Sequence, residues 1–184
     1  MYWLTIGIAL WCISHFFKRL APTARERMGD KGKGLVALAS LLAVVLMVVG
    51  YRSAPVIAVY APVPGMGHLN NLLMLVSVFL FAVSHSGGVV ESKLRHPMLI
   101  GVIVWAVAHL LVNGDLASIL LFASMGAWAV VSMALINRAA PWERPAKGVI
   151  MKDIRIAVIT LVVYGLIAGI HIWLGHSPFQ GTYA

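Results

Sequence analysis

The residues best suited to chemistry in this sequence are its histidines. There are seven of them in a chain of 184 residues that is only 11% charged. An ionisable side chain inside an apolar segment is costly to bury, so it usually has a function. Four of the seven fall within long apolar segments, namely His15, His85, His109 and His171. The alternative for each is a structural role at a helix end, which also applies to the remaining three, His68, His96 and His176.

The apolar segment around His109 has the most regular pattern. Gly101, Trp105, His109 and Asn113 recur every four residues, so on a helix they share one face. A ring cofactor lying against the glycine would place its metal within reach of the imidazole. The alternative is a helix–helix contact in which the glycine allows close approach and the His–Asn pair is a polar link.

The ligand chemistry of these histidines favours haem over zinc. Neutral imidazole is the commonest side-chain metal ligand, but zinc takes three or four ligands and usually includes cysteine or carboxylate. The apolar segments contain no Asp or Glu, and Cys12 is the only cysteine. A haem needs only one or two axial histidines, and its apolar ring suits a helix bundle. Basic side chains at the membrane surface, such as Arg95, would then receive its propionates.

The composition requires lipid as the solvent for most of the chain. Hydrophobic residues make up 61% of the sequence, against about 45–50% in soluble domains. The mean hydropathy is +0.92. The net charge of +8 lies in short connections between apolar segments, where it sets orientation. We therefore predict a lipid bilayer, and no nucleic acid, as a partner.

Six apolar segments are long enough, or nearly long enough, to cross a bilayer, which takes roughly 20 residues. Their predicted ranges are 2–17, 34–51, 69–90, 97–112, 116–136 and 156–175. Backbone groups in the bilayer core must be satisfied internally, so these segments are predicted to be helical. The sequence predicts an all-α membrane protein, a bundle of six transmembrane helices in one domain.

The basic residues predict the orientation of that bundle. Thirteen of the fourteen Lys and Arg residues follow the first, third and fifth segments, and only Arg52 lies on the other side. Basic residues stay in the cytoplasm. Both termini are therefore predicted to lie outside, in the periplasm of a Gram-negative host.

The helix around His109 also carries a family signature. The run Arg95-His96-Pro97-Met98-Leu99-Ile100-Gly101, followed by Trp105, Ala108-His109-Leu110 and Asn113-Gly114-Asp115, resembles the NnrU family. Supporting matches are Ser14-His15, Gly50-Tyr51-Arg52, Ala54-Pro55, His171, Gly175 and Pro178. The resemblance implies one NnrU-like domain over residues 1–184 in the bacterial inner membrane, linked to denitrification and nitric-oxide gene clusters.

The resemblance also implies a cofactor. A plant relative of the family, 15-cis-zeta-carotene isomerase, uses haem b, and its two axial histidines match His15 and His109. The implied function is a haem b protein that is redox-active or responds to nitric oxide, or is isomerase-like on an apolar substrate. Respiratory or denitrification membrane proteins and a small apolar or gaseous ligand are its implied partners. Straight helices would place His15 beside His96 or His85, and His109 beside His171, so these three are the alternate iron ligands.

Two other functions remain open. The pattern Arg-His-Pro-x-x-x-Gly is similar to part of the isoprenylcysteine methyltransferases, which bind S-adenosylmethionine; Arg95, His96 and Glu143 would then lie near that cofactor. Those enzymes carry paired glutamates where this chain has only Glu143. The third hypothesis is a non-enzymatic assembly factor for a respiratory complex.

Overall fold

The computed structural model describes residues 1–180, and within this range the chain is helical and forms no strand. The predicted all-α class is confirmed. The helices in chain order are α1 (Tyr2–Leu20), α2 (Pro22–Arg27), α3 (Gly29–Arg52), α4 (Met66–Val83), α5 (Val89–Lys93), α6 (Pro97–Val112), α7 (Leu116–Ser118), η1 (Ile119–Ala123), α8 (Ser124–Ala139) and α9 (Ile150–Trp173).

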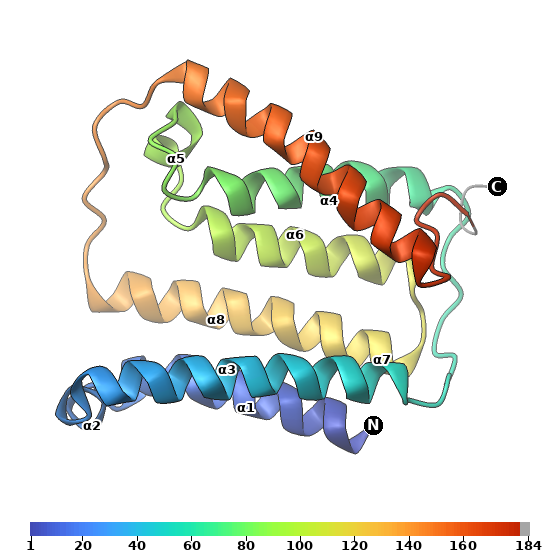
Figure 1. Ribbon diagram of the computed structural model, residues 1–184, viewed down its shortest axis with the longest axis horizontal. Helices are drawn as coiled ribbons and strands as arrows, with labels where there is room; N and C mark the ends of the chain where they lie inside the picture. The colour runs from blue at the N-terminus through green and yellow to red at the C-terminus, as the bar shows by residue number, and fades with distance from the viewer. Residues whose placement is uncertain (181–184) are drawn as a thin grey trace.

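The long helices lie side by side, and neighbours along the chain mostly run in opposite directions (Figure 1). The helix α1 packs along α3 and also contacts α8. The helix α6 packs between α4 and α8, and α9 lies on α4. Consequently α1 and α6, which carry His15 and His109, both contact the helix formed by α7, η1 and α8.

Four of the described helical segments are long and apolar enough to cross a membrane: Gly29–Arg52, Met66–Val83, Leu116–Ala139 and Ile150–Trp173. The helix α6 is also apolar but has only 16 residues. The predicted membrane character of the chain is therefore supported for these four segments.

The third apolar segment is shorter than the sequence predicted. The helix α4 ends at Val83 instead of continuing to residue 90. A turn follows because His85 and Gly87 have positive φ angles of 67° and 71°, which a helix does not allow. The carboxylate of Glu91 accepts hydrogen bonds from the backbone N–H groups of both residues. His85 is therefore an exposed turn residue and not part of a span.

Two other helices are longer than predicted. The helix α3 begins at Gly29 instead of residue 34, and α9 begins at Ile150 instead of residue 156. Both extensions contain charged residues, which hydropathy excludes from a span. A helix can include them at the membrane surface, because their long side chains keep the charged groups in water. Among them Asp153 accepts hydrogen bonds from the backbone of Val89 and Val90 at the start of α5.

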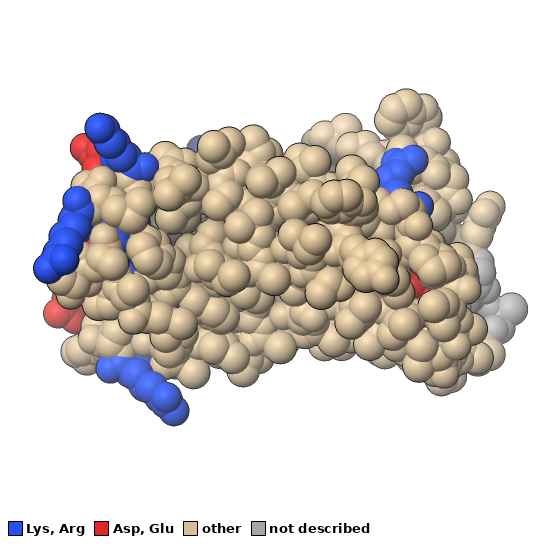
Figure 2. Space-filling model, turned by 90° about the horizontal axis from the view of Figure 1, so that it is seen from below, with Lys and Arg blue, Asp and Glu red and all other residues tan. Residues whose placement is uncertain are grey.

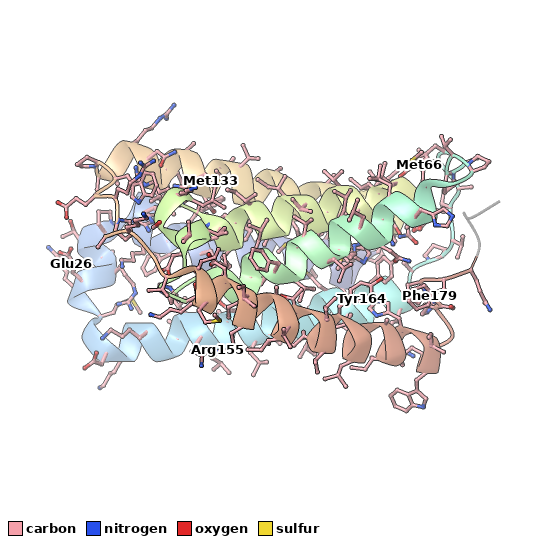
Figure 3. All side chains as sticks on the ribbon, turned by 90° about the horizontal axis from the view of Figure 1, so that it is seen from above. Glu26, Met66, Met133, Arg155, Tyr164 and Phe179 are labelled. Atoms are coloured by element: carbon pink, nitrogen blue, oxygen red, sulfur yellow. The ribbon has the colours of Figure 1, made fainter. Side chains whose placement is uncertain are left out.

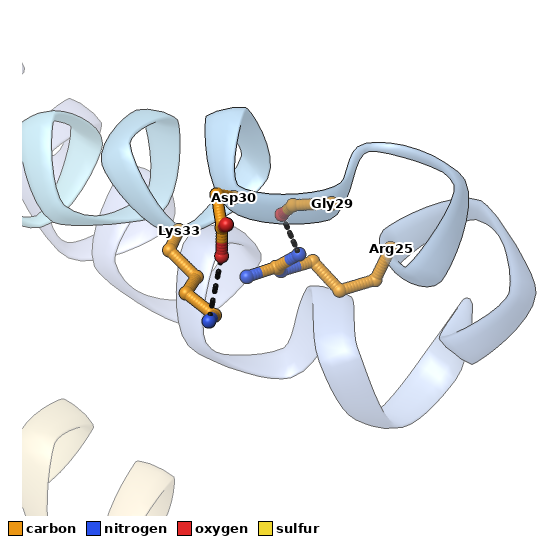
Figure 4. A network of polar contacts seen from close by, with 4 residues as sticks. All are labelled: Arg25, Gly29, Asp30 and Lys33. Atoms are coloured by element: carbon orange, nitrogen blue, oxygen red, sulfur yellow. Dashed lines mark hydrogen bonds and ion pairs between the residues drawn. The ribbon is translucent and has the colours of Figure 1, made fainter.

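Basic residues gather at one end of the bundle, and an uncharged band separates this end from the other (Figure 2). The turn between α1 and α3 belongs to this basic end. There Arg25 donates to the carbonyl oxygen of Gly29 at 3.1 Å, and Lys33 forms an ion pair with Asp30 at 2.8 Å (Figure 4). Both contacts are exposed to solvent, in a connection whose charged side chains favour water over lipid.

The opposite end is fixed by a tyrosine in the long connection between α3 and α4. The hydroxyl of Tyr60 donates to the carbonyl oxygens of Leu110 and Asn113 at the end of α6. The backbone of Tyr60 passes so close to Gly114 that a Cβ there would lie 1.9 Å from the Tyr60 carbonyl oxygen. Glycine is required at this turn, which leads directly into α7.

Candidate functional site

His15 lies on α1 in an aromatic cluster shared with α8. Its Nδ1 is 2.9 Å from the carbonyl oxygen of Trp11, one turn earlier. The imidazole stacks on the Trp11 indole with ring centroids 3.9 Å apart and meets the edge of Trp128 at 5.2 Å. The ring is therefore held between two indoles in a fixed orientation.

His109 occupies an equivalent position on α6. Its Nδ1 is 2.9 Å from the carbonyl oxygen of Trp105, and its ring stacks on Phe122 at 4.5 Å. Phe122 is 5% exposed and belongs to the π-helical turn η1. Such turns are rare and occur frequently at functional sites. This turn sets the position of the aromatic ring that covers one face of the imidazole.

His171 on α9 repeats the same local geometry, with Nδ1 at 2.8 Å from the carbonyl oxygen of Ile167. It also lies near enough to His109 that the two imidazoles would repel each other if both were protonated. A nitrogen that faces a carbonyl oxygen must carry the proton. In the neutral form of His15, His109 and His171 the lone pair therefore lies on the second nitrogen, Nε2, and this is the form that binds a metal.

The contacts along η1 and α8 give the relative depths of the histidines. His109 contacts Phe122, His15 contacts Trp128, and His96 hydrogen-bonds to Asn137 at 2.8 Å. Phe122 and Trp128 are six residues apart, which is about 9 Å along a helix. Trp128 and Asn137 are nine residues apart, which is about 14 Å. His15 is therefore closer in depth to His109 than to His96.

The directions of α1 and α6 decide how the side chains of His15 and His109 tilt. The helices α1 and α6 run in opposite directions (Figure 1). A side chain on a helix tilts toward the N-terminus of its own helix. The two imidazoles therefore lean toward each other along the bundle axis, and the offset of about 9 Å between their contact points already includes this tilt.

Two buried donors lie in the same cluster without a partner. The indole N–H groups of Trp11 and Trp128 make no hydrogen bond to any residue that the structure describes. A buried polar group is normally paired, and both indoles contact the ring of His15. The cluster therefore offers two hydrogen-bond donors beside an imidazole whose Nε2 has a lone pair.

The other residues of the predicted α6 face are occupied by contacts within the bundle. Gly101 faces α4, where Ser77 donates to its carbonyl oxygen at 2.9 Å. The side-chain amide of Asn113 donates to the carbonyl oxygen of His109 and caps the end of α6. Gly101 therefore makes a helix–helix contact, which was the alternative to a cofactor site. The side chains of Trp105 and His109 instead contact Phe122 of η1.

Arg95 and His96 lie at the basic end and hold α8. The guanidinium of Arg95 donates to the carbonyl oxygen of Ala140 at 2.7 Å and reaches that of Ile136. With His96 bonded to Asn137, both side chains bind the C-terminal turn of α8. Their polar groups are thus engaged far from His109, and the exposed Glu143 lies beyond them in the connection to α9.

The haem that the family resemblance implies would meet the following donors in the aromatic cluster. The donor set fits, because three imidazoles present Nε2 lone pairs and two orphaned indole donors lie beside one of them. No group of three or more His, Cys, Asp or Glu residues that could hold a metal ion converges within residues 1–180. The indoles of Trp11 and Trp128 now fill the space beside His15, so a ring cofactor would have to displace them.

These features define a helical membrane protein with a half-buried cluster of imidazoles and aromatic rings around η1 and α8. The sequence matches the family model described as NnrU protein over residues 3–178. The chain therefore belongs to the NnrU family. No curated protein and no solved structure matches it.

Proposed function

We propose that this NnrU protein binds haem b between α1 and α6, where His15 and His109 would hold the iron. The observation that carries the proposal is the shared geometry of the two imidazoles. Each donates from Nδ1 to the carbonyl oxygen one turn earlier and stacks on an aromatic ring, which fixes the direction of its Nε2. His171 is the alternate second ligand, because it has the same geometry and lies near His109.

Each residue of the cluster has a defined task in this proposal. The carbonyl oxygens of Trp11 and Trp105 set the tautomer and raise the basicity of the ligating nitrogens. A bound ring would displace the indole of Trp128, and its N–H, which has no partner among the described residues, would then donate to an oxygen atom of the bound group. Bound haem would supply one-electron chemistry or a binding position for a gas. The biological role would be redox or nitric-oxide linked, or isomerase-like on an apolar substrate, alongside respiratory or denitrification proteins.

We also propose that the chain crosses the bacterial inner membrane six times, with both termini in the periplasm. Two helices, α1 and α6, are not among the four candidate spans, but both pack beside helices that are. The helix α1 packs along α3, and α6 packs between α4 and α8. Thirteen of the fourteen basic residues follow the first, third and fifth apolar segments. The positive-inside rule places that end in the cytoplasm.

A visible spectrum tests the cofactor. The full chain is expressed in a bacterium supplied with a haem precursor, purified in detergent and compared with His15→Ala, His109→Ala and His171→Ala. The matched control is His176→Ala, which removes an exposed imidazole beyond α9. A Soret band is expected in the wild type and the control, and its loss or shift in His15→Ala and His109→Ala. A wild-type protein without a Soret band would refute the proposal, and a shift confined to His171→Ala and His109→Ala would reassign the second ligand.

A further inference from the structure

An apolar groove of about 240 Å³ lies between α1 and α3, near the connection that joins them. Ile13 and Phe17 of α1, Met28 at the start of α3, and Leu35 and Ala39 of α3 are among the residues that line it. Ile13 and Leu35 are 67% and 55% exposed. The groove is therefore open to the bilayer and ends near the basic end of the bundle.

The groove itself does not select one lipid over another. Ser14, which also lines it, donates its hydroxyl to the carbonyl oxygen of Trp11 at 2.9 Å, so this polar group is already satisfied. Lipid tails are as apolar as the remaining side chains of the groove, and contact with them carries no preference. A preference must come from polar groups where the groove ends.

Two lysines extend the groove toward the basic end. Lys18 follows Ser14 by four residues on α1, and Lys31 precedes Leu35 by four residues on α3. Residues four apart share one face of a helix, so each lysine continues the row of residues that lines the groove on its own helix. Both lysines are exposed. A lysine side chain can lie along apolar surface while its ammonium group stays in water.

The other charged groups of the connection leave these two lysines available. Lys33 is engaged in an ion pair and Arg25 in a hydrogen bond to the backbone (Figure 4). Within the described residues neither Lys18 nor Lys31 forms an ion pair. The connection and the helix turns beside it carry six basic and only two acidic residues, and one of the acidic residues, Glu26, lies at the outer end of the bundle (Figure 3). The field beside the groove is therefore positive.

We propose that this groove binds one acyl chain of an anionic phospholipid, whose phosphate group lies between Lys18 and Lys31. Charge complementarity selects this occupant, because basic residues at a membrane surface attract anionic lipids. A zwitterionic phospholipid has the same tails but carries its own cation beside the phosphate, and the two lysines would repel that cation. The positive-inside rule explains why basic residues gather at this end. It does not explain why two unpaired lysines continue the two rows that line an apolar groove.

Native mass spectrometry of the full chain in a neutral detergent tests the proposal. The probes are palmitoyl-oleoyl phosphatidylglycerol and phosphatidylcholine at equal concentration, which share their acyl chains and differ in headgroup charge. The wild type should bind phosphatidylglycerol in preference, and Lys18→Gln and Lys31→Gln should each reduce this preference about fivefold. The matched control is Lys93→Gln, which removes the same charge from an exposed position on α5, a helix that contacts α9.

A further variant separates the groove from the lysines. Ala39→Phe keeps both lysines but fills the groove, so it should weaken binding of phosphatidylglycerol; Val36→Phe replaces it if Ala39→Phe does not purify as a folded protein. Added inorganic phosphate should not displace the lipid, because it has no tail for the groove.

Four outcomes would overturn the proposal. They are equal binding of the two lipids to the wild type, an unchanged preference when both Lys18 and Lys31 are replaced by Gln, an equal loss in Lys93→Gln, and unchanged phosphatidylglycerol binding in the groove-filling variant. The last two would assign the effect to net charge or to the headgroup alone. The lipid adducts are read whether or not haem is bound, so the haem proposal succeeds or fails separately.

Discussion

His15 stacks on Trp11 at 3.9 Å while its Nδ1 lies 2.9 Å from the carbonyl oxygen of that same residue. Trp11 therefore fixes both the tautomer and the plane of the imidazole. On α6 these two tasks are divided, because Trp105 supplies the carbonyl and Phe122 supplies the stacking ring. The stacking partner of His109 thus comes from the π-helical turn and depends on how η1 packs.

Replacing Phe122 by alanine should destabilise the protein by about 3 kcal/mol, because it empties a buried aromatic position. It should also free the ring of His109 to rotate, so that any Soret band broadens or shifts. Thermal melting and the visible spectrum of the purified variant measure the two effects. The control is Phe179→Ala, which changes an exposed side chain. A normal melting temperature in Phe122→Ala would show that this aromatic contact contributes little.

Replacing Arg95 by alanine should lower stability by about 1 kcal/mol and leave the spectrum unchanged, because its guanidinium holds carbonyl oxygens of α8. The matched control is Arg144→Ala, whose guanidinium lies 5.4 Å from the centre of the Trp142 ring. Thermal melting and absorbance are read on the same samples. Loss of the Soret band in Arg95→Ala would instead assign Arg95 to the cofactor site.

Replacing Tyr60 by phenylalanine should cost about 1 kcal/mol, because its hydroxyl joins the loop to the end of α6. Burial and the nearby Asp115 raise the pKa of Tyr60 above its ordinary value of 10.0. The folded chain therefore favours the neutral phenol of Tyr60. The stability that this hydroxyl contributes is complete below about pH 10 and is lost as the pH rises through the raised pKa. The difference in melting temperature between wild type and Tyr60→Phe should shrink as the pH rises above about 10. A constant difference over that range would contradict the role of the hydroxyl.

Replacing Gly50 by alanine should destabilise the pairing of α1 and α3 by about 3 kcal/mol. A Cβ at Gly50 would lie 2.1 Å from the backbone nitrogen of Leu4, which cannot move away as a flexible side chain can. Gly165→Ala is the control, because within the described residues no atom lies within 4 Å of a Cβ at Gly165. Equal melting temperatures for the two variants would contradict the close approach of the helices.

Single cysteines test the orientation of the bundle. In a Cys12→Ser background, Ala61→Cys lies in the exposed connection between α3 and α4, and Glu143→Cys lies in the exposed connection between α8 and α9. A membrane-impermeant maleimide added to intact spheroplasts should label the first and not the second. Labelling of Glu143→Cys alone would invert the topology, and labelling of both would show that the two loops do not lie on opposite sides.

The sequence alone determined the helical class, the family and the end of the bundle that carries the basic residues. Hydropathy and charge are sums over many residues, so single errors do not change them. Helix ends depend on a few residues, and here the prediction for the third segment was wrong. The apolar run to residue 90 includes His85 and Gly87, whose backbone angles end the helix at Val83.

Only the tertiary structure decided which polar groups share a site. The four-residue spacing grouped Gly101 with His109, yet Gly101 packs on α4 while His109 faces η1. Four residues turn a helix by slightly more than one full turn, so a face drifts toward a different neighbour along its length. The indole N–H groups of Trp11 and Trp128, which have no partner among the described residues, had no sequence signal at all, because whether a partner is missing depends on packing between segments far apart in the chain.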